Sequence, residues 1–182
     1  MTQALLLMDI QPGILDRVGA GEPYLDQVVA VQERAEAAGL LVVLVHIAFR
    51  SGYPETSARN KVFSSGNPRS PMVIGDPSVE PHARLLRRHG EVVVTKKRVS
   101  AFTGSDLEIV LRSRDVTHLV VAGIATSGVV LSTVRDAADR DYELTVLQDL
   151  CLDVDEEVHR VLTTKVFTRQ ADVVVAADWQ PS

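Results

Sequence analysis

The sequence predicts an α/β protein whose parallel sheet is covered by helices on both faces. Apolar, β-branched runs recur along its 182 residues and are nearly continuous instead of alternating, which is typical of strands buried on both faces. Helical patterns lie between most of these runs, and strands that alternate with helices favour a parallel sheet. The six predicted strands cover residues 4–10, 40–49, 91–96, 118–124, 142–150 and 171–177.

Turn and capping residues mark the helices between these strands. Pro23 is a good first helical residue for the first of them. Ser105 and Glu108 have the spacing of a capping box, and Asp153 is the expected cap of the last helix. The predicted helices cover residues 24–38, 81–89, 106–114, 128–140 and 155–167.

Residues 50–80 interrupt the alternation. This segment is rich in Ser, Pro and Gly and is longer than a structural connection needs. Loops of that length in compact domains are often functional lids or binding loops. No boundary or internal repeat divides the chain, so residues 1–182 are expected to form one domain.

Composition excludes several classes of protein. The net charge of −5 offers no basic field, so neither nucleic acid nor a membrane surface is an expected partner. Asp9 interrupts the N-terminal apolar run, which fits a strand better than a signal peptide, and no run approaches transmembrane length. The single cysteine, Cys151, excludes an intrachain disulfide framework. A cytoplasmic protein is the expectation.

Chemically capable residues follow several of the predicted strands. Ligands of open α/β sheets bind beyond the carboxyl ends of the strands. Asp9 ends the first strand, Lys96 ends the third, and the small residues of "GIATSG" (123–128) follow the fourth. A buried lysine influences the ionisation of a nearby carboxyl, and N–H groups at a helix start stabilise a developing oxyanion. We therefore expect an active site here, although each residue taken alone has a structural explanation.

Three segments together resemble one family. "LLLMDIQPG", "VVTKKRVSAFTGSDLEIVLR" and "LVVAGIATSGVVLSTVRDAADRDYELTVLQD" look like the signature blocks of the isochorismatase-like (cysteine) hydrolase superfamily. The resemblance implies a three-layer, doubly wound six-stranded sheet in the order 3-2-1-4-5-6, assembled as a homodimer or homotetramer. It assigns the catalytic aspartate to Asp9, the catalytic lysine to Lys96 and a non-proline cis peptide bond to Ile124–Ala125.

The chain departs from the family pattern at the nucleophile. The amidohydrolase block Gly-x-x-Thr-x-x-Cys falls on Gly123, Thr126 and Val129, and valine cannot form a thioester. The chain therefore resembles the phenazine-type isochorismatases, which lack this cysteine and hydrolyse a vinyl ether without a covalent intermediate. By this resemblance the backbone N–H groups of Ala125 and Val129 bind developing negative charge.

Two other residues remain open as nucleophiles. Ser127 is interpreted as a helix N-cap and Cys151 as a small buried hydrophobe, and both are better explained structurally. The histidines show no ligand spacing, and His46 is interpreted as a buried side chain with hydrogen-bond partners. No metal and no cofactor are expected.

The family's substrate pocket is closed by the loop after the second strand and by the "SAF" segment. By resemblance, these regions and the turn supply the substrate-binding residues. Arginines in the loop would suit a substrate that carries a carboxylate, and they could equally be solvated charges. The candidates are Gln11, Phe49, Arg50, Tyr53, Phe102, Thr126 and Ser127, with Arg59 and Phe63 also in the loop.

Two functions of different classes follow. The first is a small-molecule hydrolase in which Asp9 is the general acid/base and Lys96 is its electrostatic partner. The second is an inactive family member that binds a ligand or serves as an assembly subunit. A dead pocket has no reason to keep an Asp–Lys pair, so the hydrolase is favoured.

Overall fold

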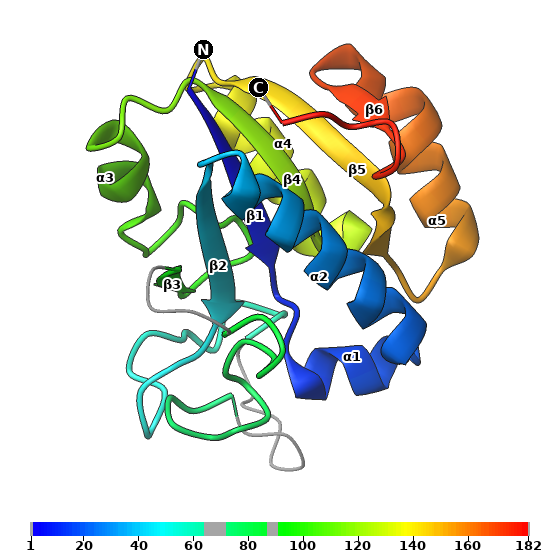
Figure 1. The fold of residues 1–182 in the computed structure, drawn as a ribbon. Helices are drawn as coiled ribbons and strands as arrows, with labels where there is room; N and C mark the ends of the chain where they lie inside the picture. The colour runs from blue at the N-terminus through cyan, green and yellow to red at the C-terminus, as the bar shows by residue number, and fades with distance from the viewer. Residues whose placement is uncertain (1, 64–71, 87–90, 182) are drawn as a thin grey trace.

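The fold is a six-stranded parallel sheet between two layers of helices (Figure 1). The computed structural model describes residues 2–63, 72–86 and 91–181. Neighbouring strands pair in parallel in the order β3-β2-β1-β4-β5-β6, which confirms the predicted fold and strand order. The strands are β1 (Gln3–Met8), β2 (Leu41–Ile47), β3 (Val92–Lys96), β4 (His118–Ile124), β5 (Glu143–Leu152) and β6 (Asp172–Val174).

Helices cover both faces of the sheet. The longest, α2, lies across the front of the sheet in Figure 1, and α4 lies behind it. The helical segments are α1 (Pro12–Val18), α2 (Glu22–Ala37), α3 (Leu107–Arg112), η1 (Thr126–Val130), α4 (Leu131–Ala138), α5 (Glu156–Val161), η2 (Leu162–Val166) and η3 (Phe167–Arg169). Among the described residues, no helix is long and apolar enough to cross a membrane.

The central strand β1 shows why the apolar runs are continuous. Leu5 and Leu7 pack into the core under α1 and α2, whereas Leu6 and Met8 pack into the core under α3 and α4. Both faces of the strand are therefore buried, and each successive residue has to be apolar.

One helix was missed and one helical prediction was wrong. The missed helix is α1, which runs from Pro12 to Val18 and is closed by Gly19, whose φ of 65° lies in the left-handed region. The predicted helix over 81–89 is absent from its described part, where residues 83–85 form a turn. Residues 87–89 lie outside the described residues.

The predicted caps were also misplaced. Ser105 donates its hydroxyl to the Ala101 carbonyl (2.6 Å), and the cap position of α3 is Asp106, without a side-chain cap. Asp155 caps α5 by accepting from two backbone N–H groups, while Asp153 reaches outward to the turn that follows β4. In both cases the cap position falls on the next acidic residue along a polar run, which composition alone does not separate.

Candidate active site

Asp9 lies immediately after β1, at the carboxyl edge of the sheet. Its backbone is left-handed (φ 56°), and its N–H donates to the Val45 carbonyl at 2.7 Å, so the chain turns out of the strand in a fixed direction. The residue is buried, with 5% exposed. One carboxylate oxygen, Oδ2, lies 2.8 Å from Nζ of Lys96. The other, Oδ1, is buried and has no hydrogen-bond partner among the described residues.

Lys96 holds this pair in one position. It ends β3 and is 1% exposed. Its Nζ also donates to the carbonyls of Arg98 (3.1 Å) and Val99 (3.2 Å), so the three donors of an ammonium are all used. The side chain is therefore a stationary charge that crosses the end of β2 to reach Asp9.

Burial raises the pKa of Asp9, and the neighbouring Lys96 opposes that rise. A carboxyl with a raised pKa can hold a proton nearer neutral pH, and the lysine stabilises the carboxylate left when the proton departs.

The turn after β4 comes close to Asp9 because of a glycine. Gly123 pairs with Met8, the residue before Asp9, and a Cβ at Gly123 would lie 2.2 Å from the Met8 carbonyl oxygen. Only glycine allows this approach. The next bond, Ile124–Ala125, is cis, as the family resemblance implied.

The turn itself is held by contacts from another segment. The Thr126 hydroxyl, fully buried, lies 2.8 Å from Nδ1 of His159, and the Ser127 N–H donates to Oδ2 of Asp153 at 2.7 Å. Ser127 is therefore not the predicted N-cap: Ala125 takes that position, and no side chain caps η1. Sequence reasoning missed His159, because a contact across 33 residues leaves no local pattern.

Comparison with known proteins agrees with this geometry. An isochorismatase domain matches residues 3–178. The chain belongs to the isochorismatase family. Its relatives include YecD, an uncharacterized isochorismatase family protein of Escherichia coli O157:H7, which is 30% identical over 176 residues covering 94% of this chain and 91% of that protein.

Two further relatives extend the comparison. A probable inactive nicotinamidase of Arabidopsis thaliana is 30% identical over 164 residues, covering 86% of this chain and 83% of that protein. An isochorismatase family protein of Burkholderia thailandensis has a solved structure with a TM-score of 0.81 and 30% identity, covering 97% of this chain and 93% of that one. Members of the isochorismatase family are hydrolases, and this chain has their fold.

Val129 and Cys151 are both buried. Val129 stands where the resemblance places the family's cysteine, and it is 2% exposed. Cys151 pairs with Gly123 across β4 and β5, and burial raises the pKa of its thiol to about 12. The thiol is thus protonated at neutral pH, which fits the predicted role of a small buried hydrophobe.

Gln11 and His46 are fixed by hydrogen bonds at the end of β2. The Gln11 amide accepts from the Ile47 N–H (3.1 Å) and donates to the carbonyls of Ile47 (3.1 Å) and Val79. Both ring nitrogens of His46 have partners at 2.8 Å, Val79 and Thr95, as predicted for a buried histidine. Through these hydrogen bonds, Gln11 and His46 connect β2 to the segment around residue 79.

The remaining candidates lie in the loop after β2 and after β3. Phe49 is buried against the rings of Tyr53 (5.6 Å between centroids) and Phe63 (5.4 Å). Arg50 is exposed and pairs with Glu55 at 3.0 Å. Phe102 packs against Tyr142 in the core between α3 and α4.

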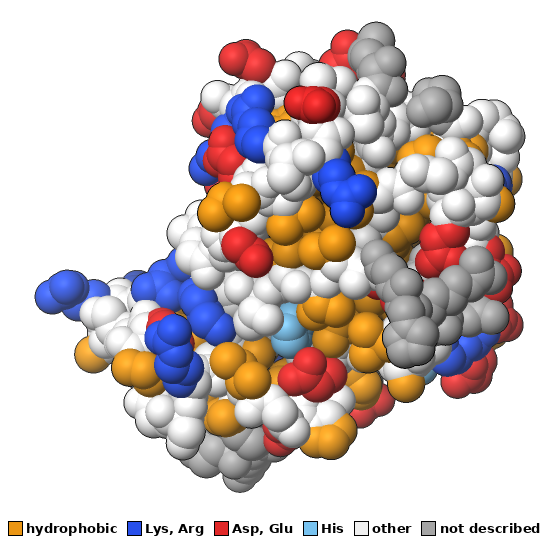
Figure 2. Space-filling view, turned by 60° about the vertical axis from the view of Figure 1, so that its left-hand side comes forward, with side chains coloured by type: hydrophobic (Ala, Val, Ile, Leu, Met, Phe, Trp, Pro, Cys, Tyr) orange, Lys and Arg blue, Asp and Glu red, His pale blue; other side chains and the backbone are white. Residues whose placement is uncertain are grey.

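Basic and hydrophobic side chains lie next to one another on one face of the molecule. Figure 2 shows Lys and Arg side chains gathered on a protruding part of one face, next to hydrophobic side chains. Arg50, Arg59 and Lys61 are the exposed basic residues of segment 50–63. Among the described residues, no group of three His, Cys, Asp or Glu side chains could hold a metal ion.

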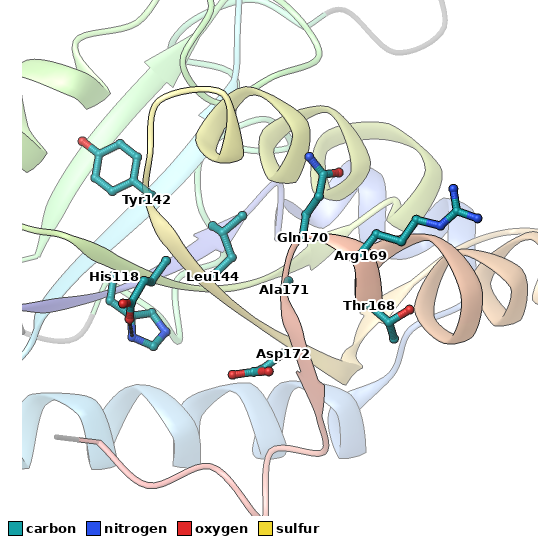
Figure 3. Close-up of a pocket in the computed structure, with 9 residues that line it drawn as sticks. His118, Tyr142, Leu144, Thr168, Arg169, Gln170, Ala171 and Asp172 are labelled. Atoms are coloured by element: carbon teal, nitrogen blue, oxygen red, sulfur yellow. Dashed lines mark ion pairs between the residues drawn. The ribbon is translucent and has the colours of Figure 1, made fainter.

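A separate pocket opens at the opposite, amino edge of the sheet. It has a volume of about 430 Å³ and contains none of the predicted site residues. Figure 3 shows residues from β4, β5, β6 and η3 around it. Its lining is His118, Tyr142, Glu143, Leu144, Thr168, Arg169, Gln170, Ala171 and Asp172.

Proposed function

We propose that this protein hydrolyses a small molecule that contains a vinyl ether or an activated carbonyl, with Asp9 as general acid/base and water as the nucleophile. The proposal rests on the different surroundings of the two Asp9 carboxylate oxygens. Lys96 holds Oδ2, while Oδ1 is buried and has no hydrogen-bond partner among the described residues. A buried acceptor without a partner is costly, so a site that keeps one is expected to use it.

With a vinyl ether, protonated Asp9 would transfer its proton to the terminal carbon of the double bond. The resulting oxocarbenium ion is attacked by water, and Asp9, now a carboxylate next to Lys96, takes a proton from that water. The hemiketal then collapses with cleavage of its C–O bond, releasing an alcohol and a ketone. The buried lysine favours the carboxylate that the first step creates.

With an activated carbonyl, Asp9 would instead remove a proton from the attacking water. The N–H groups of Ala125 and Val129 are proposed to bind the oxyanion, and the proton on Asp9 passes to the leaving group as the intermediate collapses. Neither route attaches the substrate to the protein. Phe49, Arg50 and Tyr53 are proposed to contact the substrate, and Arg50 would suit a carboxylate on it.

A second candidate is an inactive ligand-binding member of the family. It is favoured by Val129 at the nucleophile position and by the burial of the one cysteine. The buried Asp9–Lys96 pair argues against it, because a charge pair of this kind is weak evidence for stability and needs another reason to persist.

The test is turnover of vinyl ethers and activated esters by wild type and Asp9→Asn. We expect Asp9→Asn to lose about 10²–10⁴-fold in rate, the usual worth of general acid–base catalysis. Glu143→Gln, which removes an exposed carboxylate at the opposite edge, is the matched control and should leave the rate unchanged.

Intact-protein mass during turnover tests the absence of a covalent intermediate. We expect no substrate-sized adduct on the wild type. An adduct on Ser127 or Cys151 would mean that a side chain, not water, attacks. Full activity in Asp9→Asn would refute the whole scheme, and a protein that binds these compounds without turning any over would be the inactive member.

A further inference from the structure

The turn of residues 125–129 is weakly determined by its own residues. No side chain caps η1, and Gly128 has non-helical backbone angles (φ −98°, ψ −105°) inside it. The N–H groups of Gly128 and of Val130, the residue after the turn, both donate to the Ala125 carbonyl, at 3.0 and 3.3 Å. A turn built this way needs outside contacts to keep its N–H groups in one direction.

Those contacts come from the connection between β5 and α5 and from α5 itself. Asp153 accepts from the Ser127 N–H, and the His159 ring reaches the buried Thr126 hydroxyl. The segment is itself well fixed: Asp155 accepts from Glu157 N–H (3.0 Å) and Val158 N–H at 3.1 Å. The His159 N–H donates back to the Asp155 carbonyl at 3.0 Å, so the ring leaves the helix at a set position.

The two anchored residues stand between the two residues that the reaction needs. Thr126 and Ser127 follow Ala125 directly and precede Val129 by three and two positions. We propose that His159 and Asp153 are positioning residues, which orient the Ala125 and Val129 N–H groups by holding Thr126 and Ser127. This inference rests on the proposed function for the catalytic use of those N–H groups, but the anchoring can be measured without any substrate.

The mechanism of positioning is geometric. His159 comes from α5, which packs against η1, and Asp153 comes from the connection before that helix. The bond from the Ser127 N–H to Asp153 fixes the peptide plane between Thr126 and Ser127. That plane lies between the two peptide planes that carry the Ala125 and Val129 N–H groups, so a rotation of it would change the relative direction of those two groups. Such donors act well only when they are already oriented before charge develops.

The first experiment uses Val129→Cys as a reporter of the turn. The introduced thiol belongs to the turn itself, and Cys151→Ala in the same protein leaves it as the one thiol of the chain, since Val129 and Cys151 are both buried. We expect the thiol's pKa, read from thiolate absorbance, to lie below that of the buried Cys151, because N–H groups at the start of a helix favour the thiolate. Adding His159→Ala should raise that pKa by about one unit, which means about tenfold less thiolate at any pH well below the pKa.

Three variants separate positioning from a general effect on folding. His159→Asn keeps a polar atom near the place of Nδ1 and should restore the lower thiol pKa. Thr126→Val removes the partner hydroxyl, and its effect should not add to that of His159→Ala because both break one contact. Arg160→Ala, which breaks only the surface pair with Glu157 on the same helix, should leave the thiol pKa unchanged.

The second measurement uses the protein with Val129 in place. In amide NMR spectra, His159→Ala should shift the Ala125 and Val129 signals and His159→Asn should not. An unchanged thiol pKa in His159→Ala, an equal change in Arg160→Ala, or no rescue by His159→Asn would overturn the proposal. If His159→Ala does not fold, Thr126→Val decides by the same readouts. Loss of the proposed hydrolysis would leave these results untouched, so the two ideas fail separately.

Discussion

The two edges of the sheet carry similar residues in different surroundings. At the carboxyl edge, the side chains of Lys96 and Asp9 are 2% and 7% exposed and lie 2.8 Å apart. At the amino edge, His118 and Glu143 are 15% and 57% exposed and lie 3.6 Å apart. Interaction between charges is far stronger away from water than beside it. Burial, more than residue type, therefore distinguishes the charge pairs of the two edges.

The largest expected effect comes from breaking the buried pair. Lys96→Met leaves the Asp9 carboxyl buried without its cation, which should lower the free energy of unfolding by about 3–5 kcal/mol at pH 8. The loss should shrink as the pH falls toward 4. Burial raises the pKa of Asp9 above 3.8, its value in the unfolded chain. The stability that proton binding to Asp9 contributes is therefore fully present below pH 3.8 and is lost as the pH rises through the folded pKa.

Urea unfolding at pH 5 and pH 8 measures this difference. Lys165→Met is the control, since Lys165 is exposed and should change the unfolding free energy by less than about 0.5 kcal/mol. A loss below about 1 kcal/mol at pH 8 would mean that Asp9 is not confined as the structure has it.

A smaller effect is expected for the buried thiol of Cys151, which pairs across the strands with Gly123. Cys151→Ala removes a packed thiol and should cost about 1 kcal/mol of stability. Turnover should be unchanged, because a thiol whose pKa is raised to about 12 is protonated at neutral pH and does not attack. Thermal melting and initial rates test both halves. Abolished turnover with an intact fold would place the nucleophile on β5.

The sequence predicted the sheet because its inner strands follow one rule, while the edge strands β3 and β6 are only partly buried. Continuous apolar runs such as "ALLLM" mean two buried faces, and both faces of β1 are indeed packed. It missed α1, because Pro12 and Gly13 suggest a loop, although Pro12 in fact begins the helix and Gly13 donates its N–H to the Ser78 carbonyl at 2.9 Å. That partner lies 65 positions away in the printed sequence, where no local pattern could reveal it.

The site was predictable as far as it depends on strand ends. Asp9 and Lys96 meet because parallel strands finish at one edge, which the sequence pattern contains. The cis bond at Ile124–Ala125 came only from the family resemblance. The contact between His159 and Thr126 could be found only in the three-dimensional structure, because a tertiary hydrogen bond depends on the angle at which α5 meets η1.

The smallest expected effect lies at the amino edge and concerns pH. Burial lowers the pKa of His118, and the carboxylates of Glu143 and Asp172 partly oppose this. The folded protein therefore binds the proton less readily than the unfolded chain, whose histidine has a pKa of about 6.5. The stability that His118 contributes is present above that value and is lost as the pH falls through the folded pKa.

His118→Gln should remove this term while keeping a polar side chain near Thr145. Between pH 7 and pH 5 the variant should lose less stability than the wild type, by less than about 0.5 kcal/mol because solvent screens a half-buried group. Glu143→Gln should act in the opposite direction, since Glu143 favours the charged histidine. Melting temperatures at the two pH values measure both. A change in the pH profile of turnover in His118→Gln would contradict the separation of the two edges, because a residue at the amino end of β4 would then influence Asp9 across the length of the sheet.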